Sequence, residues 1–200
     1  MNYLAIDTSG KNLLIVLNKN GNVFSVREEN CMEQHSVTLI KETERLLTEN
    51  GLTLFDMDFF VVVVGPGSFT GIRIGVATVK AFSLAVNKPV LKITSFDTIT
   101  YNKGIGRYLA VIDAKHDNFY AQGVFDRKTD FGPAFISLKE LKELEKEYRL
   151  ISFDDIPNSE KTDTVEGLVR AVEAKNKERT FDLDGVRPLY IRKSQAEENR

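Results

Sequence analysis

Short apolar runs separated by turn-forming residues open the chain. The runs YLAID, NLLIVLN and VFSVREE begin at residues 3, 12 and 23, and the letters TSGK and KNGN stand between them. Turns that contain Asn and Gly between apolar runs are typical of antiparallel hairpins. The first part of the chain is therefore expected to form a meander of three antiparallel strands.

The apolar positions then change to helical spacing. Residues 33–50 place apolar side chains three and four positions apart, and Gly51 is a candidate for the C-cap of this helix. The run FFVVVV at residues 59–64 shows no alternation. Such a run is typical of a strand covered on both faces, as in the parallel part of a mixed sheet.

A second predicted helix, residues 70–87, is apolar almost all round. Its only charges are Arg73 and Lys80. A surface helix of a monomer shows a polar face. One side must therefore meet its own sheet, and the other needs cover from elsewhere in the chain or from another subunit. We interpret this helix as an indication of a partner.

The second half of the chain repeats the form of the first. The run YLAVIDA at residues 108–114 resembles NYLAIDT at residues 2–8, and FYAQGVFD follows it as a second hairpin strand. This repeat indicates an internal duplication of a strand, Asp, turn and strand. With NKGIG at residues 102–106 as the hinge, we expect α/β lobes at 1–104 and 105–200.

Composition narrows the class of protein. A chain of 200 residues with 42% hydrophobic content can bury a sizeable core. Its 27 basic and 29 acidic residues give a formal charge of -2, which provides no global attraction for nucleic acid or acidic membranes.

The single cysteine, Cys31, excludes an internal disulfide and favours a reducing compartment. The N-terminus lacks a targeting signal and the longest uncharged apolar run, residues 59–64, is too short to span a bilayer, so we expect a soluble cytoplasmic protein.

Two Asp-containing turns carry candidate chemistry. The sequence IDTSG places Asp7, Thr8 and Ser9 at a strand end, where actin-like ATPases hold a carboxylate and turn amides around a phosphate and its magnesium. Asp113 ends the repeated strand in the same way. These residues are also ordinary turn formers, so a plain hairpin explains them as well. Ser9 stands where the Asp-Thr-Gly turn of an aspartic protease needs its glycine, which excludes that chemistry.

The stretch GPGSFTGIRIG, residues 65–75, joins the apolar strand to the second predicted helix. It matches neither the GxxxxGKS/T pattern nor GxGxxG. Gly65 and Gly67 permit backbone conformations closed to other residues, and Ser68 or Thr70 can cap the helix. The residues alone leave two interpretations open: an anion site at the helix N-terminus, or a corner packed tightly against a neighbour.

Neither histidine predicts a metal site. His35 has Thr38 and Leu39 where a helical metal pair needs its second ligand, and His116 lies in the polar turn AKHDN. The spacing also supports no Ser-His-Asp arrangement and no reactive cysteine.

Five stretches together resemble the TsaB (YeaZ) family. They are LAIDTS, a helix beginning near QHS, GPGSFTGIRIG, VIDAKHDNFYA and PLYIR, in an order and spacing that match along nearly the whole chain. The glycine stretch is the specific part. Its motif residues are Gly65, Pro66, Gly67, Ser68, Phe69, Thr70, Gly71, Arg73 and Gly75.

The resemblance implies an actin-like ATPase (ribonuclease H-like) fold with two lobes, mixed sheets and a reduced second lobe. It implies a non-catalytic scaffold that binds and stabilises TsaD, the metal-bearing subunit that makes threonylcarbamoyladenosine in tRNA. TsaD is the expected partner in a heterodimer, TsaE docks on that pair, and the chain forms a homodimer without TsaD. The resemblance also implies that ATP and metal bind to the partner subunits and that this chain holds no cofactor. It implies contact with tRNA only through the complex.

The same resemblance favours a corner and interface signature for the glycine stretch. It also implies partner-interface residues on the two predicted helices: Val37, Ile40, Leu47, Ile72, Val76, Val79 and Lys80. Changing Val76 or Val79 to Asp is accordingly expected to abolish TsaD binding and to leave the fold largely intact.

The chain departs from the family at two places. Lys115 stands where the family often has Arg, which removes a forked donor, and the Glu and Pro that usually follow the histidine of the first helix are missing after His35. No Gly-Gly segment follows Lys139 to hold an adenosine as in active actin-like ATPases, so we expect no independent ATP hydrolysis. Three rival functions stand beside the family's function. The first rival is a small magnesium-nucleotide-dependent kinase or acyltransferase that uses Asp7 and Asp113. The others are a protease related to TsaD and a homodimeric module with unrelated partners.

Overall fold

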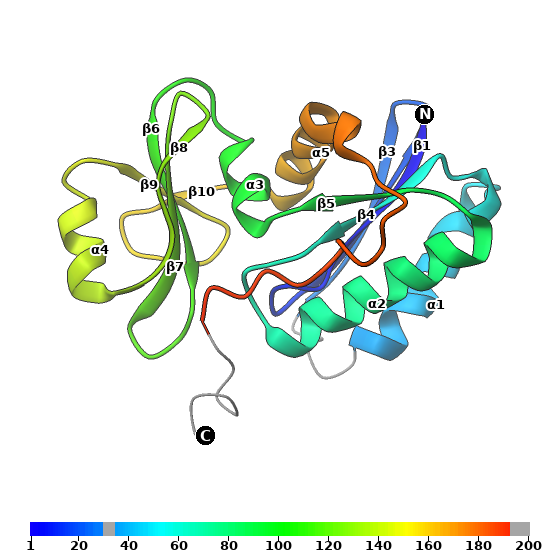
Figure 1. The fold of residues 1–200 in the computed structure, drawn as a ribbon, viewed down its shortest axis with the longest axis horizontal. Coiled ribbons are helices and arrows are strands. Elements are labelled where there is room, and N and C mark those ends of the chain that lie inside the picture. The colour runs from blue at the N-terminus through cyan, green and yellow to red at the C-terminus, as the bar shows by residue number, and fades with distance from the viewer. Residues whose placement is uncertain (30–34, 193–200) are drawn as a thin grey trace. The chain divides into compact units, whose positions relative to one another are not determined.

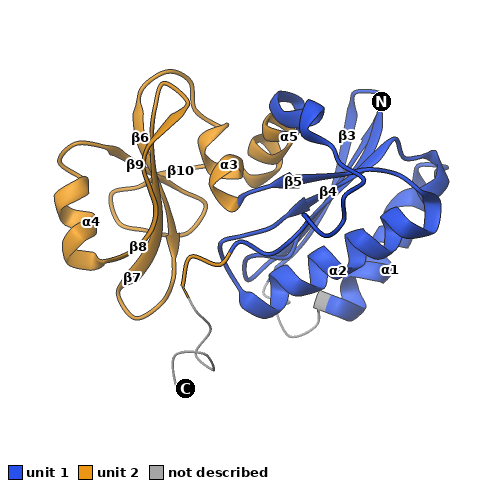
Figure 2. Cartoon of the chain, in the orientation of Figure 1, with its two compact units in different colours: residues 1–94, 172–189 blue, residues 95–171, 190–200 orange. Residues whose placement is uncertain are grey.

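The computed structural model describes residues 1–29 and 35–192 (Figure 1). The chain divides into two compact units, which Figure 2 shows in different colours. Of the described residues, unit 1 comprises Met1–Thr94 and Val172–Leu189, and unit 2 comprises Ser95–Ala171 and residues 190–192.

The observed division differs from the expected lobes 1–104 and 105–200. The first boundary follows Thr94, because the next helix, α3 (Ser95–Thr100), buries Phe96 and Ile99 in the core of unit 2. The chain then returns to unit 1 at Val172. A domain boundary placed at a single glycine-containing segment cannot predict such a return, because the return depends on packing between residues that are distant in sequence.

Unit 1 is built on a five-stranded mixed sheet in the order β3-β2-β1-β4-β5. The strands are β1 Asn2–Asp7, β2 Leu13–Lys19, β3 Asn22–Glu28, β4 Phe59–Val63 and β5 Val90–Ile93. The first three pair antiparallel, whereas β4 runs parallel to β1 and β5 parallel to β4. The predicted meander and the predicted strand covered on both faces are confirmed, since every residue of β4 is buried.

Two helices, α1 (His35–Glu49) and α2 (Phe69–Val86), lie side by side on one face of this sheet (Figure 1). Their buried residues form one core with the sheet and include Leu39, Leu46, Ile72, Val76 and Val79. Gly51 has a φ of +65° and its N–H donates to the Thr48 carbonyl at 3.0 Å, while the Leu52 N–H donates to Leu47 at 2.9 Å. These two bonds confirm the predicted glycine C-cap of α1.

A late segment of the chain completes unit 1. It follows α5 (Thr164–Lys175) and the short helix η3 (Asn176–Glu178). Thr180 and Val90 exchange two backbone hydrogen bonds of 2.8 and 2.9 Å, and Val186 is fully buried in the unit 1 core. The segment thereby covers part of the free edge of β5, which would otherwise present unpaired N–H and C=O groups.

Unit 2 repeats the sheet of unit 1. Its order is β10-β9-β6-β7-β8, with β6, β7 and β8 antiparallel and β9 parallel to β6, as β4 is to β1. The strands are β6 Arg107–Asp113, β7 Asn118–Phe125, β8 Lys128–Ser137, β9 Arg149–Ser152 and β10 Glu160–Lys161. This common topology agrees with the predicted duplication.

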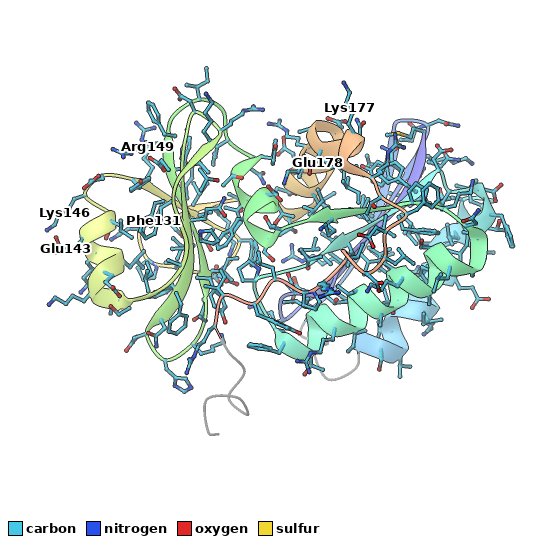
Figure 3. All side chains as sticks on the ribbon, in the orientation of Figure 1. Phe131, Glu143, Lys146, Arg149, Lys177 and Glu178 are labelled. Atoms are coloured by element: carbon cyan, nitrogen blue, oxygen red, sulfur yellow. The ribbon has the colours of Figure 1, made fainter. Side chains whose placement is uncertain are left out.

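The two faces of the unit 2 sheet are covered by short helices. Leu109 and Val111 share a core with Leu141 of α4 (Leu138–Leu144), and Ala110 and Ile112 share another with α3. With 7 residues, α4 is half as long as the 15-residue α1. Its outer side is charged, and Lys146 beyond its end lies 2.5 Å from Glu143 (Figure 3).

Among the described helices, α2 is long and apolar enough to cross a membrane by length and composition alone. This criterion is weak for a single helix, because core helices of water-soluble proteins also meet it. In unit 1, one side of α2 packs against the sheet.

Candidate functional site

The turn after β1 holds a buried carboxylate. Asp7 Oδ1 accepts hydrogen bonds from the Ser9 N–H at 2.8 Å and from Ser9 Oγ at 2.6 Å. Burial raises the pKa of the Asp7 carboxyl above its ordinary value of 3.8, although both bonds from Ser9 act in the opposite direction. Asp7 therefore shapes a local turn, and its charged form is disfavoured in the folded state.

We expect Asp7→Asn to change how stability depends on pH. A raised folded-state pKa means that the stabilisation from Asp7 is present below the unfolded pKa and is lost as pH rises through the folded pKa. Asn stays neutral and keeps an oxygen for the two bonds from Ser9. The variant should therefore exceed the wild type at pH 8 by on the order of 1 kcal/mol, with a smaller difference at pH 4.

Urea denaturation from pH 4 to 8 measures this difference. Ser9→Ala is the matched control, since it removes one bond to Asp7 and keeps the carboxyl. If wild type and Asp7→Asn give parallel curves across the whole range, Asp7 does not titrate abnormally in the folded protein.

The glycine stretch packs against this same turn. Thr8 Oγ1 donates to the Gly71 carbonyl at 2.7 Å, and the Ser68 N–H donates to the Ser9 carbonyl at 2.7 Å. A Cβ at Gly67 would stand 2.2 Å from the Ser9 carbonyl oxygen, and a Cβ at Gly71 would stand 2.0 Å from that of Thr8. Such a close approach of backbone to backbone requires glycine.

The geometry favours the corner over the anion site. The positions that a Cβ at Gly67 or Gly71 would occupy are faced by carbonyl oxygens of Ser9 and Thr8, which repel an anion. Ser68 is the N-cap of α2, and its Oγ accepts the Gly71 N–H at 3.2 Å. Of the two caps that the sequence allowed, the structure uses Ser68, and Thr70 is exposed.

The remaining motif residues complete this corner. Gly75 approaches the same turn, because a Cβ there would stand 2.4 Å from Thr8 Oγ1. Gly65 has a φ of +101°, and a Cβ there would stand 2.6 Å from Ile72. Pro66 is buried, Phe69 half-buried and Arg73 exposed.

The turn after β6 in unit 2 holds Asp113 and Lys115. The Lys115 N–H donates to Asp113 Oδ1 at 2.8 Å, and Lys115 Nζ lies 2.6 Å from Oδ2. Partial burial opposes the charge of Asp113, but the bonds from Lys115 outweigh it and lower the pKa of that carboxyl. The Asp113 N–H donates to Asp154 at 2.9 Å. The backbone and the side chain of Lys115 are thus both engaged by the carboxylate of its own turn.

The remaining candidates are the two histidines and the single cysteine. The described residues contain no group of three or more His, Cys, Asp or Glu side chains that could hold a metal ion. His116 is exposed in the β6–β7 turn. The side chain of His35 and the whole of Cys31 lie outside the described residues.

The expected interface residues divide into exposed and buried ones. Val37 and Ile40 on α1 are 74% and 49% exposed, as an interface requires, and Lys80 is half-buried. The others are in the unit 1 core: Leu47 5%, Ile72 0%, Val76 6% and Val79 0% exposed. These four side chains pack within their own unit and leave little surface for a partner to cover, so the structure does not support the prediction for them.

Sequence reasoning missed the exposed side of α2. The residues there are Ala77, Ala81, Leu84 and Ala85. Their helical spacing places them together, opposite Ile72, Val76 and Val79. The missing information was which side of an all-apolar helix meets the sheet.

Comparison with known proteins identifies the family. The sequence profile described as "TsaD: tRNA N6-adenosine threonylcarbamoyltransferase" matches residues 25–167, which is more than half of the chain. The chain belongs to the TsaD family. Curated relatives place it with the TsaB (YeaZ) members.

Two of these relatives are TsaB proteins of different bacteria. TsaB of Escherichia coli (strain K12) is 31% identical over 124 residues, which cover 60% of this chain and 53% of that relative. TsaB of Bacillus subtilis (strain 168) is 31% identical over 133 residues, or 64% of this chain and 56% of the relative. The chain thus spans little more than half the length of the curated TsaB relatives that it matches.

Solved structures of TsaB (YeaZ) proteins share the fold. YeaZ from Pseudomonas aeruginosa superposes with a TM-score of 0.74 at 21% identity, over 94% of this chain and 99% of that one. A second Pseudomonas aeruginosa protein, described as similar to peptidase YEAZ, gives 0.77 at 22% identity, over 96% and 99%. The chain thus has the fold of these YeaZ structures, and its two mixed sheets of like topology agree with the expected two-lobed α/β architecture.

Proposed function

We propose that this member of the TsaD family takes part in making threonylcarbamoyladenosine in tRNA, as a non-catalytic subunit that binds a TsaD protein. The proposal includes the expected docking of TsaE on that pair, a cytoplasmic location, and tRNA contact only through the complex. ATP and metal are assigned to the partner subunits. The names of the curated relatives support the pathway, and the surface of unit 1 supports the mode of action.

One observation carries the proposal: α2 exposes an apolar side. Leu84 is 73% exposed, and Ala77, Ala81 and Ala85 lie beside it on the outer side of the helix. On the neighbouring α1, Val37 and Ile40 are also exposed. Contiguous exposed apolar side chains mark interaction sites, and alanines allow a partner helix to approach closely. We call this surface, made of these six residues, the α1–α2 face.

The turns support a role without catalysis in this chain. Asp7 accepts its two hydrogen bonds from Ser9, and the glycine corner is closed by carbonyl oxygens. In unit 2, Asp113 is neutralised by Lys115. These carboxylates therefore act as turn formers. The alternative, an enzyme that uses a magnesium nucleotide, requires that they turn toward a ligand instead.

The test is to place a charge at the centre of the α1–α2 face. Ala81 is exposed, so Ala81→Asp should keep the circular dichroism spectrum and the melting temperature of the wild type. It should weaken the complex with TsaD of the same organism at least tenfold, because the new carboxylate loses its water on binding. Ala174→Asp, an exposed alanine near the end of α5, is the matched control.

Light scattering on a sizing column measures the mixed complex, and calorimetry measures nucleotide binding. If Ala81→Asp and Ala174→Asp bind TsaD equally well, the α1–α2 face is not the docking surface. If the isolated wild-type chain binds magnesium ATP tightly and ignores TsaD, the alternative enzyme is the better function.

A further inference from the structure

The dipeptide Asn-Gly occurs twice in this chain, and both copies lie in unit 1. Asn20 and Gly21 form the two-residue turn between β2 and β3, with φ of +51° and +94°, as is typical of Asn-Gly hairpins. Asn50 and Gly51 follow the last residue of α1. In this dipeptide the side-chain amide can react with the next backbone nitrogen, because glycine has no Cβ to hinder the approach. The two copies therefore place one reaction in two different surroundings of the same fold.

This reaction, deamidation, consumes only water. The backbone nitrogen of the glycine attacks the Cγ of asparagine and loses its proton, and the side-chain nitrogen leaves as ammonia. The cyclic imide that results is then opened by one water molecule. Opening at one carbonyl gives aspartate, and opening at the other gives isoaspartate, whose main chain is one methylene longer. The net change is one asparagine and one water to one acidic residue and one ammonia, with no oxidation or reduction.

The surroundings of Asn20 favour the reaction. Its Oδ1 accepts a hydrogen bond from the Met1 nitrogen at 3.0 Å, which stabilises the negative charge that develops on this oxygen when Cγ is attacked. Its Nδ2, the leaving group, makes no hydrogen bond with the part of the chain that the structure describes. Asn20 and Gly21 are both exposed. The attacking group is restrained, because the Gly21 N–H donates to Asn18 Oδ1 at 3.0 Å. The turn must therefore open locally before Asn20 reacts.

The surroundings of Asn50 oppose the same reaction. Its Nδ2 donates to the Leu46 carbonyl at 2.8 Å, so the leaving group is tied to the last turn of α1. The Gly51 N–H, which is the attacking group here, donates to the Thr48 carbonyl at 3.0 Å as part of the C-cap. Asn50 is also half-buried. Reaction at Asn50 thus requires the end of a helix to unwind, whereas reaction at Asn20 requires only an exposed turn to open.

Lys19 connects the two sites. It pairs with Asn22 across the turn that holds Asn20, and its Nζ donates to the Asn50 carbonyl at 2.8 Å. A cation at this place stabilises the C-terminal end of α1. An isoaspartate at residue 20 lengthens the turn by one methylene and so disturbs the pair of Lys19 and Asn22. The change in the turn therefore reaches the end of α1.

We propose that Asn20 is a site of spontaneous deamidation, restrained by the bond from Gly21 to Asn18, and that its isoaspartate product loosens the end of α1. The modified fraction grows with the age of the molecule, because the released ammonia does not return. The inference does not depend on the proposed function, since it uses only contacts of the first hairpin and of α1.

Peptide mapping by mass spectrometry measures both sites in one sample of the full chain, kept at pH 8 either folded or in urea. In urea the two dipeptides should react at rates within about threefold of each other, because the fold no longer separates them. In the folded chain Asn20 should react about tenfold faster than Asn50 or more, and more slowly than it does in urea. Equal rates in the folded chain overturn the proposal. So does a folded chain in which Asn20 stays intact while the chain in urea reacts to completion.

Asn18→Ala tests the restraint. The variant removes the acceptor of the Gly21 N–H, so Asn20 should react about threefold faster or more. Asn50 is the internal control, since its rate rises only if the variant unfolds. In that case Asn2→Ala, which removes the acceptor of the Asn20 N–H at 3.1 Å, replaces it. An unchanged rate at Asn20 in a folded variant contradicts the assigned restraint.

Hydrogen exchange tests the effect on α1. Asn20→Asp carries the new charge without the extra methylene and is the matched control for the aged wild type, whose isoaspartate is identified by labelling with isoaspartate methyltransferase. The amides of residues 50–52 should exchange about threefold faster or more in the aged chain than in Asn20→Asp, because only isoaspartate lengthens the turn. Equal exchange in the two samples overturns the link from the turn to α1.

Discussion

We expect Val79→Asp to unfold unit 1 at neutral pH. Val79 is fully buried in the core that α2 shares with the sheet. An ionised carboxylate at this position has no water and no cation, which costs about 4 kcal/mol or more. That amount approaches the whole stability of many domains, about 5 to 15 kcal/mol. Hydrogen exchange of the β1 and β4 amides measures the loss of protection directly.

Ala77→Asp is the matched control for this prediction. Ala77 lies two residues earlier in α2 and is exposed, so the same new charge remains in water. We expect it to fold normally and to lose binding across the α1–α2 face. The opposite result, a folded Val79→Asp that fails only to bind TsaD, would restore the sequence-based interface and contradict the observed burial.

Gly71→Ala should destabilise the protein by about 3 kcal/mol or more, although alanine is ordinarily the better helix residue by about 1 kcal/mol. The new Cβ would stand 2.0 Å from the Thr8 carbonyl oxygen and 3.2 Å from the Thr8 carbonyl carbon. Both atoms belong to the backbone, so no flexible side chain can move aside. The helix and the β1–β2 turn must separate, which also stretches the bond from Thr8 Oγ1 to the Gly71 carbonyl.

Gly10→Ala provides the comparison, since Gly10 lies in the same β1–β2 turn. A Cβ at Gly10 would meet only the Asn12 backbone nitrogen at 4.0 Å, an ordinary contact. Its effect on the free energy of unfolding should stay within about 1 kcal/mol. Urea denaturation of the two variants side by side decides the matter. Equal stabilities would mean that the corner is loose enough to accept a methyl group.

The strands that the pattern predicted have the composition that is typical of strands, whereas the missed strand β8 does not. The runs before and after TSGK and the run FFVVVV are rich in β-branched, aliphatic and aromatic residues and became β1, β2 and β4. The strand β8 contains Gly132 and Pro133, and half of its residues are exposed. It lies at the edge of its sheet, where proline is tolerated because one side of the strand needs no ladder bond. Local pattern cannot predict an edge position.

The candidate site, too, has features that the sequence predicts and features that depend on the fold. Ser68 as a helix cap and the need for glycine around it follow from residue type and order. The sequence does not show why glycine is required at these positions. The reason is that Thr8 and Ser9, about 60 positions earlier in the chain, approach Gly67 and Gly71 closely. The resemblance to TsaB proteins favoured a corner there, and the distances supply its physical basis.

The sequence by itself determined the first three strands, the strand covered on both faces, the two helices of unit 1, the duplicated sheet unit and the family, because these depend on local spacing and on motif residues. Only the tertiary structure decided the boundary after Thr94, the return of residues 172–189 to unit 1, and which side of α2 is exposed. The sequence of a helix that is apolar all round does not distinguish the side that packs on its own sheet from the side that is exposed. That choice is made by the positions of β1, β4 and α1 around α2, because these elements contact the helix only in the folded chain.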